Sequence, residues 1–208
     1  MEEFEKKFNF DNPDYSEIPS HRFFRTELLR ELSRFADRGE CSDIIEVGAG
    51  SGEYANFLRK NGFHVSVIEP SESGQALIQE RFPEIQILDV PVYSSFRVSD
   101  SNTAILALEV IEHCFDPRLF LERIFESLED GLFVVSTPFH GYWKNLVLSA
   151  VDGWDEHFTV DWKNGHIKFF SERTLRAMLE SVGFKIVKIQ RYGRIPVLAR
   201  GMVFYCVK

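Results

Sequence analysis

The amino-acid sequence predicts an α/β protein built on a doubly wound, mostly parallel sheet of seven strands with helices on both faces. Three observations support this fold class. Short apolar runs alternate with segments of helical periodicity along most of the chain. A glycine-rich stretch follows the first apolar run directly, as it does where a strand turns into a helix. The chain ends in two β-like segments around a turn, which predicts an antiparallel last strand.

The expected elements follow from the spacing of apolar residues, taken in chain order. Apolar residues at every third or fourth position predict helices at residues 20–35, 53–60, 71–81, 117–128 and 171–182. Ser20 and Ser171 are suitable N-caps for the first and last of them. Gly39, Gly62 and Gly183 stop three of these helices. Continuous or alternating apolar runs predict strands at residues 43–47, 63–68, 85–88, 103–108, 132–136, 184–190 and 197–207.

The chain divides into an N-terminal arm with a helix, residues 1–39, and a main domain, residues 40–208. The regular pattern lapses after Pro138, and this insertion, at about residues 139–165, holds all three tryptophans. Loops of such length in a compact domain are functional or disordered, and the aromatic content argues against disorder. We interpret the insertion as an aromatic lid over a substrate, with a small secondary core as the alternative. Its residues 146–151 are expected to form a short helix that contacts a core or a membrane surface.

Composition restricts the class of protein. The 208 residues are 44% hydrophobic, enough for a buried core, and the formal net charge of −8 makes a nucleic-acid partner unlikely. Cys41, Cys114 and Cys206 form no C-x-x-C pair, so neither a disulfide framework nor a thiolate zinc site is expected. No apolar stretch has membrane-spanning length, and the acidic N-terminus lacks the pattern of a secretory signal. We therefore expect a cytoplasmic protein; the sequence leaves the oligomeric state open.

The glycine-rich stretch indicates a loop that a ligand approaches closely. Gly48, Gly50 and Gly52 are spaced G-x-G-x-G, one residue shorter than the G-x-G-x-x-G of dinucleotide-binding loops. Glu53 then begins the helix, and its charge would oppose a pyrophosphate at the helix N-terminus. Glu69 follows the second strand, where an acidic residue can accept hydrogen bonds from ribose hydroxyls. These residues favour a nucleoside ligand without phosphate; a tight turn with a surface glutamate is the alternative.

An ordered set of motifs extends this pattern over roughly residues 40–190. The motifs are EVGAGSG at residues 46–52, IEPS at 68–71, ALEVIEH at 107–113, FVVSTP at 133–138 and GHIKFFSERTLRAMLESVGF at 165–184. Together they resemble the class I S-adenosylmethionine-dependent methyltransferases. The set is most similar to the subgroup that includes ubiquinone-type O-methyltransferases and methyltransferases of sugar and natural-product pathways. The resemblance implies a Rossmann-like fold and S-adenosyl-L-methionine as cofactor.

The resemblance also implies which residues contact that cofactor. The glycine loop and Glu46 would face the methionine end, Glu69 the ribose hydroxyls, and Asp89 the adenine amino group. Pro70, beside the ribose-binding acid, and Pro91 depart from the family pattern and bear on the shape of the loops. The full set of implied cofactor-binding residues is Glu46, Gly48, Ala49, Gly50, Gly52, Glu69, Pro70, Asp89, Leu108 and Glu109.

The segment after the fourth strand carries candidate catalytic groups. Methyl transfer needs mainly alignment, with a base only where the acceptor must lose a proton. Glu109, Glu112 and His113 form E-x-x-E-H, and with His166 they resemble the metal set of small-RNA 2′-O-methyltransferases. Other interpretations are that His113 is a general base or cofactor contact, or that it is structural. We take His113 as the catalytic candidate and assign no metal site.

The predicted function is methyl transfer to a small-molecule acceptor, at oxygen by resemblance to the subgroup. Apolar walls with a few polar groups are typical of small-molecule sites, so the substrate-binding candidates are Trp143, Trp154, His157 and His166. Three other hypotheses stay open. They are a metal-assisted RNA 2′-O-methyltransferase, a non-catalytic module that binds a nucleoside cofactor, and an NAD-dependent oxidoreductase, which the glycine spacing disfavours.

Overall fold

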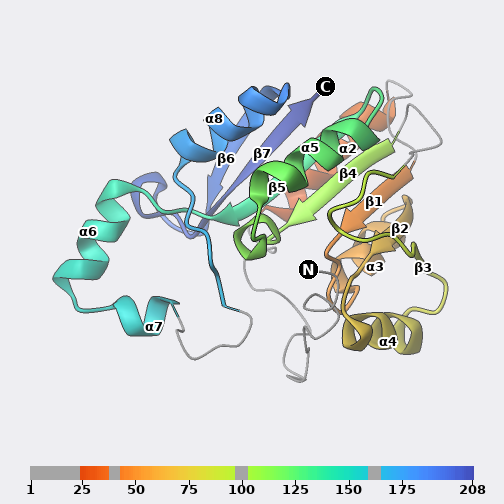
Figure 1. Ribbon diagram of the computed structural model, residues 1–208, viewed down its shortest axis with the longest axis horizontal. Helices are drawn as coiled ribbons and strands as arrows, with labels where there is room; N and C mark the ends of the chain where they lie inside the picture. Colours follow the sequence, from red (N-terminus) through yellow and green to blue (C-terminus); the bar gives the residue numbers. More distant parts are fainter. Residues whose placement is uncertain (1–23, 38–42, 97–102, 159–164) are drawn as a thin grey trace.

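The computed structural model describes residues 24–37, 43–96, 103–158 and 165–208. They form one seven-stranded sheet in the order β3-β2-β1-β4-β5-β7-β6 (Figure 1). The strands are β1 (Asp43–Val47), β2 (His64–Ile68), β3 (Gln86–Ile87), β4 (Thr103–Leu108), β5 (Leu132–Pro138), β6 (Lys185–Tyr192) and β7 (Gly201–Val207). The helices are α2 (Arg25–Asp37), α3 (Glu53–Lys60), α4 (Glu72–Arg81), η2 (Ile111–His113), α5 (Pro117–Ser127), α6 (Tyr142–Ala150), α7 (Trp154–Phe158), α8 (Glu172–Val182) and η3 (Pro196–Leu198).

Strands β1 to β5 pair in parallel, and β7 lies between β5 and β6, antiparallel to both. The predicted fold class, including the antiparallel C-terminal strand, is therefore confirmed. The predicted start of the last strand was wrong, because residues 196–198 form the short helix η3 and β7 begins only at Gly201. Pro196 has no backbone N–H to donate to a neighbouring strand, which favours the turn over the ladder.

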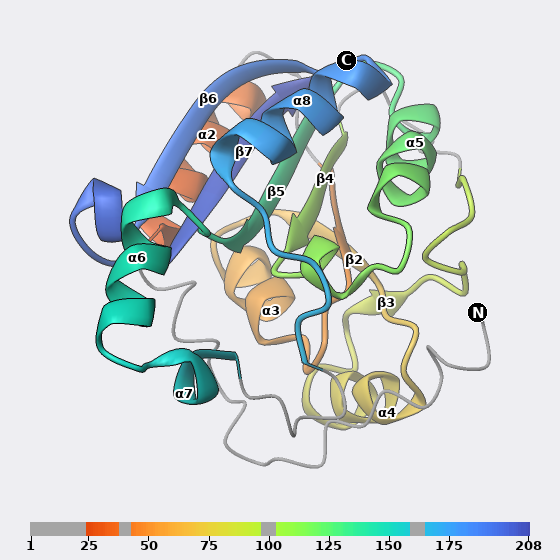
Figure 2. The ribbon, with the colours of Figure 1, turned by 60° about the vertical axis from the view of Figure 1, so that its left-hand side comes forward.

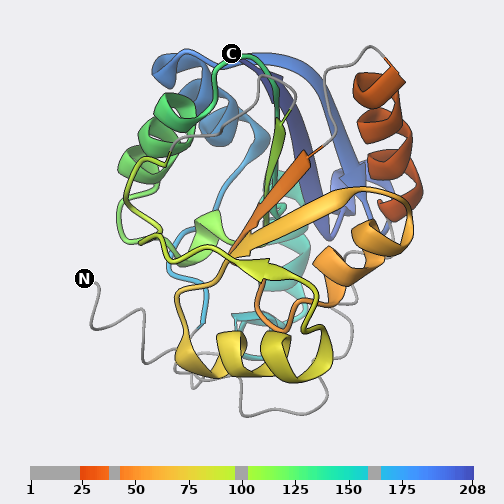
Figure 3. The same ribbon diagram turned by 90° about the vertical axis from the view of Figure 1, so that its right-hand side faces the viewer.

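Two layers of helices cover the sheet, as Figure 3 shows from its edge. Helices α5 and α8 pack on one face, and α2 and α3 on the other. Strand β4 (TAILAL) is buried along its whole length, with Ile105 and Ala107 in the first core and Ala104 and Leu106 in the second. The predicted parallel strand buried on both faces is therefore present.

Helices α6 and α7 follow β5 and extend from the carboxyl-end edge of the sheet, away from the two cores (Figures 1 and 2). The predicted short helix begins earlier than expected, since Tyr142 and Trp143 belong to α6. The large exposed apolar side chains of this region are Tyr142, Trp143, Leu146, Val147, Val151 and Trp154. The division into an arm at 1–39 and a main domain with a lid stays a prediction; Ser20, Gly39 and Trp162 lie outside the described residues.

Two of the three cysteines lie in the described part of the chain. Cys114 and Cys206 are buried free thiols, and burial raises the pKa of the Cys206 thiol. Cys41 lies outside the described residues. None of the described helices has both the length and the apolar character that crossing a bilayer requires.

Candidate functional site

The predicted cofactor residues gather where four neighbouring strands end. The chain runs outward from β1 through β2 to β3, then returns to place β4 on the other side of β1. Such a reversal in strand order opens a crevice at the carboxyl ends of the strands, where α/β proteins bind ligands. The glycine loop follows β1, Glu69 follows β2, Asp89 lies beyond β3, and Glu109 follows β4.

The glycines of the loop adopt backbone conformations that a residue with a larger side chain could adopt only with strain. Gly48, Gly50 and Gly52 have φ angles of 74°, 57° and 74°, in the left-handed region. A Cβ atom added to Gly48 would lie 2.6 Å from Cγ2 of Val110, and one added to Gly52 would lie 2.8 Å from Cγ1 of Ile78. The loop therefore needs glycine for its own conformation, in addition to any ligand that approaches it.

Glu69 is a buried carboxylate that connects the ends of β1 and β2. Its Oε2 accepts from the Gly50 backbone N–H at 2.7 Å. Its Oε1 accepts from the backbone N–H of Ser71 at 2.9 Å and from the Ser71 hydroxyl at 2.6 Å. Burial raises the pKa of Glu69, and these hydrogen bonds oppose that shift. Because a carboxylate has about four acceptor positions, the group can still accept hydroxyl donors from a ribose.

Glu46 lies under the loop, against the first turn of α3. It is 2% exposed, and no hydrogen-bond partner among the described residues reaches its Oε2. Burial and the nearby charge of Glu69 raise the pKa of Glu46 to about 8, and the Ala55 backbone N–H opposes this shift. A buried acceptor without a donor is costly, so this oxygen fits a ligand that brings one, such as an ammonium group.

Helix α4 approaches the loop closely and also changes one electrostatic expectation. A Cβ on Gly74 would lie 2.8 Å from the Gly50 carbonyl oxygen, so this glycine allows the contact. Arg81 of α4 forms an ion pair with Glu53. The carboxylate at the start of α3 is thus partly neutralised, and it opposes a bound phosphate less than the sequence suggested. The G-x-G-x-G spacing of the loop is therefore a stronger argument against a bound pyrophosphate than the charge of Glu53 is.

The remaining predicted cofactor residues differ in burial. Ala49 and Leu108 are 8% and 3% exposed and pack in the core beneath the strand ends. Pro70 is partly buried beside Glu69. Asp89 is exposed. The assigned contacts of these side chains with a cofactor stay predictions.

Glu109 begins a buried polar network that the sequence did not reveal. It has a φ of 57°, unusual for a residue with a side chain, directly after β4. Its Oε1 accepts from the Ser136 hydroxyl at 2.8 Å and from the Tyr192 hydroxyl at 2.9 Å. Burial raises the pKa of Glu109, opposed first by these two bonds and then by the charge of Lys144. Ser136 and Tyr192 lie 27 and 83 residues away from Glu109 along the chain, so no local motif marks them.

Glu112, His113 and His166 come together beside this network. Their candidate ligand atoms lie within 4.8 Å of one another, and Oε1 of Glu112 is 4.0 Å from Nε2 of His166. Glu112 is fully buried, and no described group makes a hydrogen bond of good geometry to either carboxylate oxygen. Burial raises the pKa of Glu112 well above its usual value, and the charge of Glu109 adds to the shift. Glu109 itself stays bound to Ser136 and Tyr192, so the predicted four-residue set is assembled only in part.

A second group lies where α6 begins, and the sequence reasoning missed its lysine, Lys144. Lys144 and His140 are 4% and 7% exposed, and His140 lies near the predicted substrate residue His157, with ring centroids 5.8 Å apart. Burial lowers the pKa of His140 to about 3 and that of His157 to about 4, and the charge of Lys144 contributes to both. A lysine in the first turn of an amphipathic helix looks solvated in a sequence, which is why it gave no signal.

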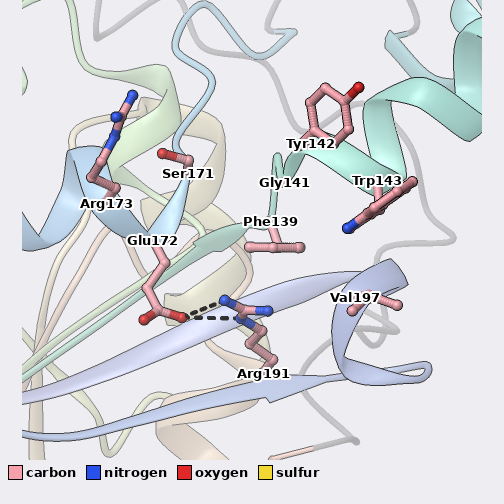
Figure 4. Close-up of a pocket in the computed structure, with 9 residues that line it drawn as sticks. All are labelled: Phe139, Gly141, Tyr142, Trp143, Ser171, Glu172, Arg173, Arg191 and Val197. Carbon is pink, nitrogen blue, oxygen red and sulfur yellow. Dashed lines mark hydrogen bonds and ion pairs between the residues drawn. The ribbon is translucent and has the colours of Figure 1, made fainter.

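The two described tryptophans of the predicted lid have different surroundings. Trp154 stacks on Phe158 with ring centroids 4.7 Å apart. Trp143 instead lines an open groove of about 240 Å³ between the starts of α6 and α8 and strand β6 (Figure 4). In that groove Arg191 bonds Glu172 through two N–H groups, at 3.0 and 2.8 Å. The substrate-binding roles given to the tryptophans stay predictions.

Strand order, the antiparallel β7 and acidic residues at neighbouring strand ends define the class of Rossmann-like methyltransferase folds. Magnesium protoporphyrin IX methyltransferase from Synechocystis PCC 6803, solved with bound SAH, has this fold. It superposes with a TM-score of 0.63 at 14% identity over 88% of this chain and 83% of its own.

The family follows from the sequence match. Residues 20–189 match the family described as a methyltransferase domain, and the chain belongs to that family. This confirms the predicted resemblance to S-adenosylmethionine-dependent methyltransferases and leaves the NAD-dependent oxidoreductase without support.

Two curated relatives illustrate the range of the family. A probable S-adenosylmethionine-dependent methyltransferase of Mycobacterium tuberculosis is 25% identical over 59% of this chain and 44% of its own length. A ubiquinone biosynthesis O-methyltransferase of Caulobacter vibrioides is 28% identical over 77% of this chain and 70% of its own. The chain thus spans about half the length of the mycobacterial relative that it matches.

Proposed function

We propose that the protein is an enzyme that transfers the methyl group of S-adenosyl-L-methionine to a small-molecule acceptor, at oxygen. The observation that carries the proposal is that the left-handed glycine loop, Glu69 and Glu46 meet at the carboxyl ends of β1 and β2, where the strand order reverses. When bound, the cofactor supplies an activated methyl group, so the protein has mainly to bind and align.

The chain's own groups fit the parts of that cofactor. Glu69 has acceptor capacity for the ribose hydroxyls, and the unsatisfied oxygen of Glu46 suits the ammonium of the methionine part. Glu109, fixed by Ser136 and Tyr192, borders the methionine part from the other side of the loop. Fixed groups of this kind restrict the orientation of the reacting methyl.

The oxygen acceptor is supported by similarity to ubiquinone biosynthesis O-methyltransferases, which are 24–28% identical to this chain. His113, next to His166, keeps its predicted catalytic role as part of the proposal. The small-molecule partner and the cytoplasmic location likewise stay predictions.

The test measures whether the protein transfers a labelled methyl group to any molecule in a mixture of candidate acceptors. The purified protein is incubated with methyl-labelled cofactor and a small-molecule extract of the native organism, and products are identified by mass spectrometry. We expect a labelled product that Glu69→Gln reduces strongly and that the exposed Glu72→Gln leaves unchanged. Cofactor binding without any labelled product would instead indicate a non-catalytic binding module.

A second candidate is metal-assisted methylation, which the cluster of Glu112, His113 and His166 favours. One carboxylate and two imidazoles form a donor set that zinc, manganese or iron accepts. The ligand atoms of one such ion lie closer together, about 3–4 Å apart for bonds of about 2.0–2.2 Å, so these side chains would have to draw together.

Metal content decides this candidate independently of activity. The protein is loaded with Zn²⁺ or Mn²⁺, desalted and analysed for bound metal, with Glu112→Gln as the test variant and the exposed His64→Gln as its control. One ion per chain that Glu112→Gln abolishes would support the candidate. Activity that survives complete chelation would remove it.

A further inference from the structure

Helix α6 turns an apolar face toward solvent. Five residues at positions i, i+3, i+4, i+7 and i+8 share one face of the helix and its C-cap, and all five are exposed: Trp143, Leu146, Val147, Ala150 and Val151. This spacing is typical of the side of a helix that packs on a core. In α6 a different side faces the protein, since Lys144 is buried and donates to the Phe139 carbonyl. The five residues therefore form an exposed apolar stripe.

Apolar side chains extend the stripe at both of its ends. At the start of α6, Trp143 also lines the groove of Figure 4, together with Val197 of η3. At the other end, the indole N–H of Trp154 donates to the Ser149 hydroxyl at 3.0 Å, which holds α7 beside α6. Figures 1 and 2 show both helices projecting from the sheet, so this surface lies away from the two cores.

The exposed area is large enough for a protein interface. The four large side chains of the stripe are 44–66% exposed, and Trp154 and Val197 are 40% and 46% exposed. Together they offer on the order of 600 Å² of surface, as much as the largest apolar patch on a typical monomer. Two such surfaces in contact would bury about 1,200 Å², which is the lower end of the range for specific interfaces.

The two ends of α6 carry opposite charges. Asp152 and Asp155 are exposed just after its C-terminal end. Arg194 is exposed near its N-terminal end, because it precedes η3, which lies against α6. The stripe between these ends is uncharged. If two copies of α6 pair antiparallel about a two-fold axis, Arg194 of each copy faces the two acids of the other. The surface is therefore complementary to itself in charge.

A membrane surface fits these charges less well. Helices that lie in a membrane interface carry Lys and Arg beside their apolar face, where anionic lipids attract them. Here Asp152 and Asp155 border the stripe, and the formal net charge of the chain is −8. An anionic leaflet would repel both. The charges thus favour a second copy of the chain over a lipid surface.

We propose that the apolar stripe of α6 pairs with the same stripe of a second copy of this chain, antiparallel, in a two-fold symmetric dimer. Ala150, with its small side chain, lets the two helices approach closely. The antiparallel arrangement brings Val151 of one copy toward Trp143 and the groove of the other. The pairing goes beyond the proposed function and does not depend on it. It offers the exposed ring of Trp143 a protein contact, where the sequence predicted a substrate contact.

Sedimentation velocity of the purified full chain tests the pairing. Protein concentrations run from about 1 to 100 µM, because an interface near the small end of the range is expected to be weak. We expect the mass to rise with concentration from the 24.1 kDa of one chain toward twice that value. Leu146→Glu places a charge from each copy at the centre of the interface and should weaken the dimer at least about tenfold. Val187→Glu, on β6, is the matched control because Val187 is also about half exposed.

Reversal of the charges tests the antiparallel arrangement by itself. Arg194→Glu places like charges opposite each other and should weaken the dimer about 3–10-fold. Adding Asp155→Arg to that variant forms the pair again with reversed signs and should recover most of the loss. Circular dichroism checks that each variant is folded. No recovery in the double variant would contradict the antiparallel arrangement.

Two further outcomes would overturn the proposal. One is a chain that stays monomeric at the highest concentration, and the other is a dimer that Leu146→Glu leaves equally strong. Flotation with vesicles of phosphatidylcholine and phosphatidylserine distinguishes the alternative occupant. A monomeric chain that binds these vesicles, and loses that binding in Leu146→Glu, would assign the stripe to a membrane. Calorimetry with S-adenosylhomocysteine on the same samples tests the proposed function separately, so either proposal can fail while the other stands.

Discussion

The proposed donor crevice and the proposed acceptor region at the start of α6 hold their polar groups in different ways. At the crevice, Glu69 is bound by backbone N–H groups of Gly50 and Ser71 and by one adjacent hydroxyl. Under α6, Lys144 is bound by carbonyl groups of segments as far apart as Phe139 and Arg200. The first arrangement is built from the ends of neighbouring strands, and the second depends on how distant segments pack.

This difference has a functional consequence. A cofactor that does not differ between relatives can be bound by a loop whose backbone conformation depends on glycines. We propose that the acceptor is instead bound by side chains near the start of α6, a helix that extends beyond the sheet (Figure 2). Substitutions at the crevice should therefore affect cofactor binding, while those under α6 should affect acceptor chemistry.

The largest effect is expected at the loop. Gly48→Val forces a β-branched residue to a φ of 74° and brings a Cβ 2.6 Å from Val110. We expect the free energy of unfolding to fall by about 3 kcal/mol and cofactor binding to be lost. Gly62→Ala is the matched control, because Gly62 has a φ of 95° with no atom within 4 Å of an added Cβ. It should cost about 1 kcal/mol of backbone strain and leave binding unchanged. Urea unfolding and calorimetry measure both quantities.

Glu46 should make stability depend on pH. Its folded-state pKa of about 8 lies above the ordinary value of 4.5, so its contribution is fully present below pH 4.5 and lost as pH rises to 8. Glu46→Gln has no ionisable side chain at this position, so the variant does not lose this stability as the pH rises. We expect the variant to gain stability over wild type between these pH values, by about 2–4 kcal/mol at pH 8. Unfolding curves of both proteins at pH 5 and pH 8 measure this gain. If the two proteins differed in stability by the same amount at both pH values, Glu46 would not be buried and protonated.

Glu69→Gln tests the ribose contact. The substitution keeps the size of the side chain but loses a charge-assisted acceptor, which is worth about 1.5–3 kcal/mol. Affinity for S-adenosylhomocysteine should therefore fall about 10–100-fold, with little change in circular dichroism. The exposed Glu72→Gln, in the first turn of α4, should bind as wild type. Unchanged affinity in Glu69→Gln would place the ribose elsewhere.

Tyr192→Phe should have the smallest of these effects. It removes the hydroxyl that donates to Glu109 at 2.9 Å, a bond worth about 1–2 kcal/mol to a carboxylate. We expect kcat/KM to fall about 5–30-fold, with KM for the cofactor raised. Tyr142→Phe, 73% exposed on α6, is the control and should keep wild-type kinetics.

The sequence predicted the fold, and the proximity of the glycine loop, Glu46 and Glu69, because both depend on local patterns. Strands β1 and β4 have the predicted bounds, and helix α3 does as well. Glycine spacing and an acid after a strand are short-range signals, and parallel strands bring their carboxyl ends together whatever the details of packing.

The acceptor region could not be predicted to the same depth. Lys144 looked like a surface residue, and its burial depends on β7 and the turn before it meeting the start of α6. Tyr192 and Ser136 reach Glu109 from two different strands. Such contacts leave no regular spacing of residues in the sequence, because they depend on the order of the strands at the C-terminal edge of the sheet.

The most direct test of the central claim is calorimetry of the purified chain with S-adenosylhomocysteine and, separately, with NAD. The crevice between β1 and β4 predicts saturable one-to-one binding of S-adenosylhomocysteine, weakened in Glu69→Gln, and no binding of NAD. Binding of NAD alone, or wild-type affinity for S-adenosylhomocysteine in both Gly48→Val and Glu69→Gln, would contradict it.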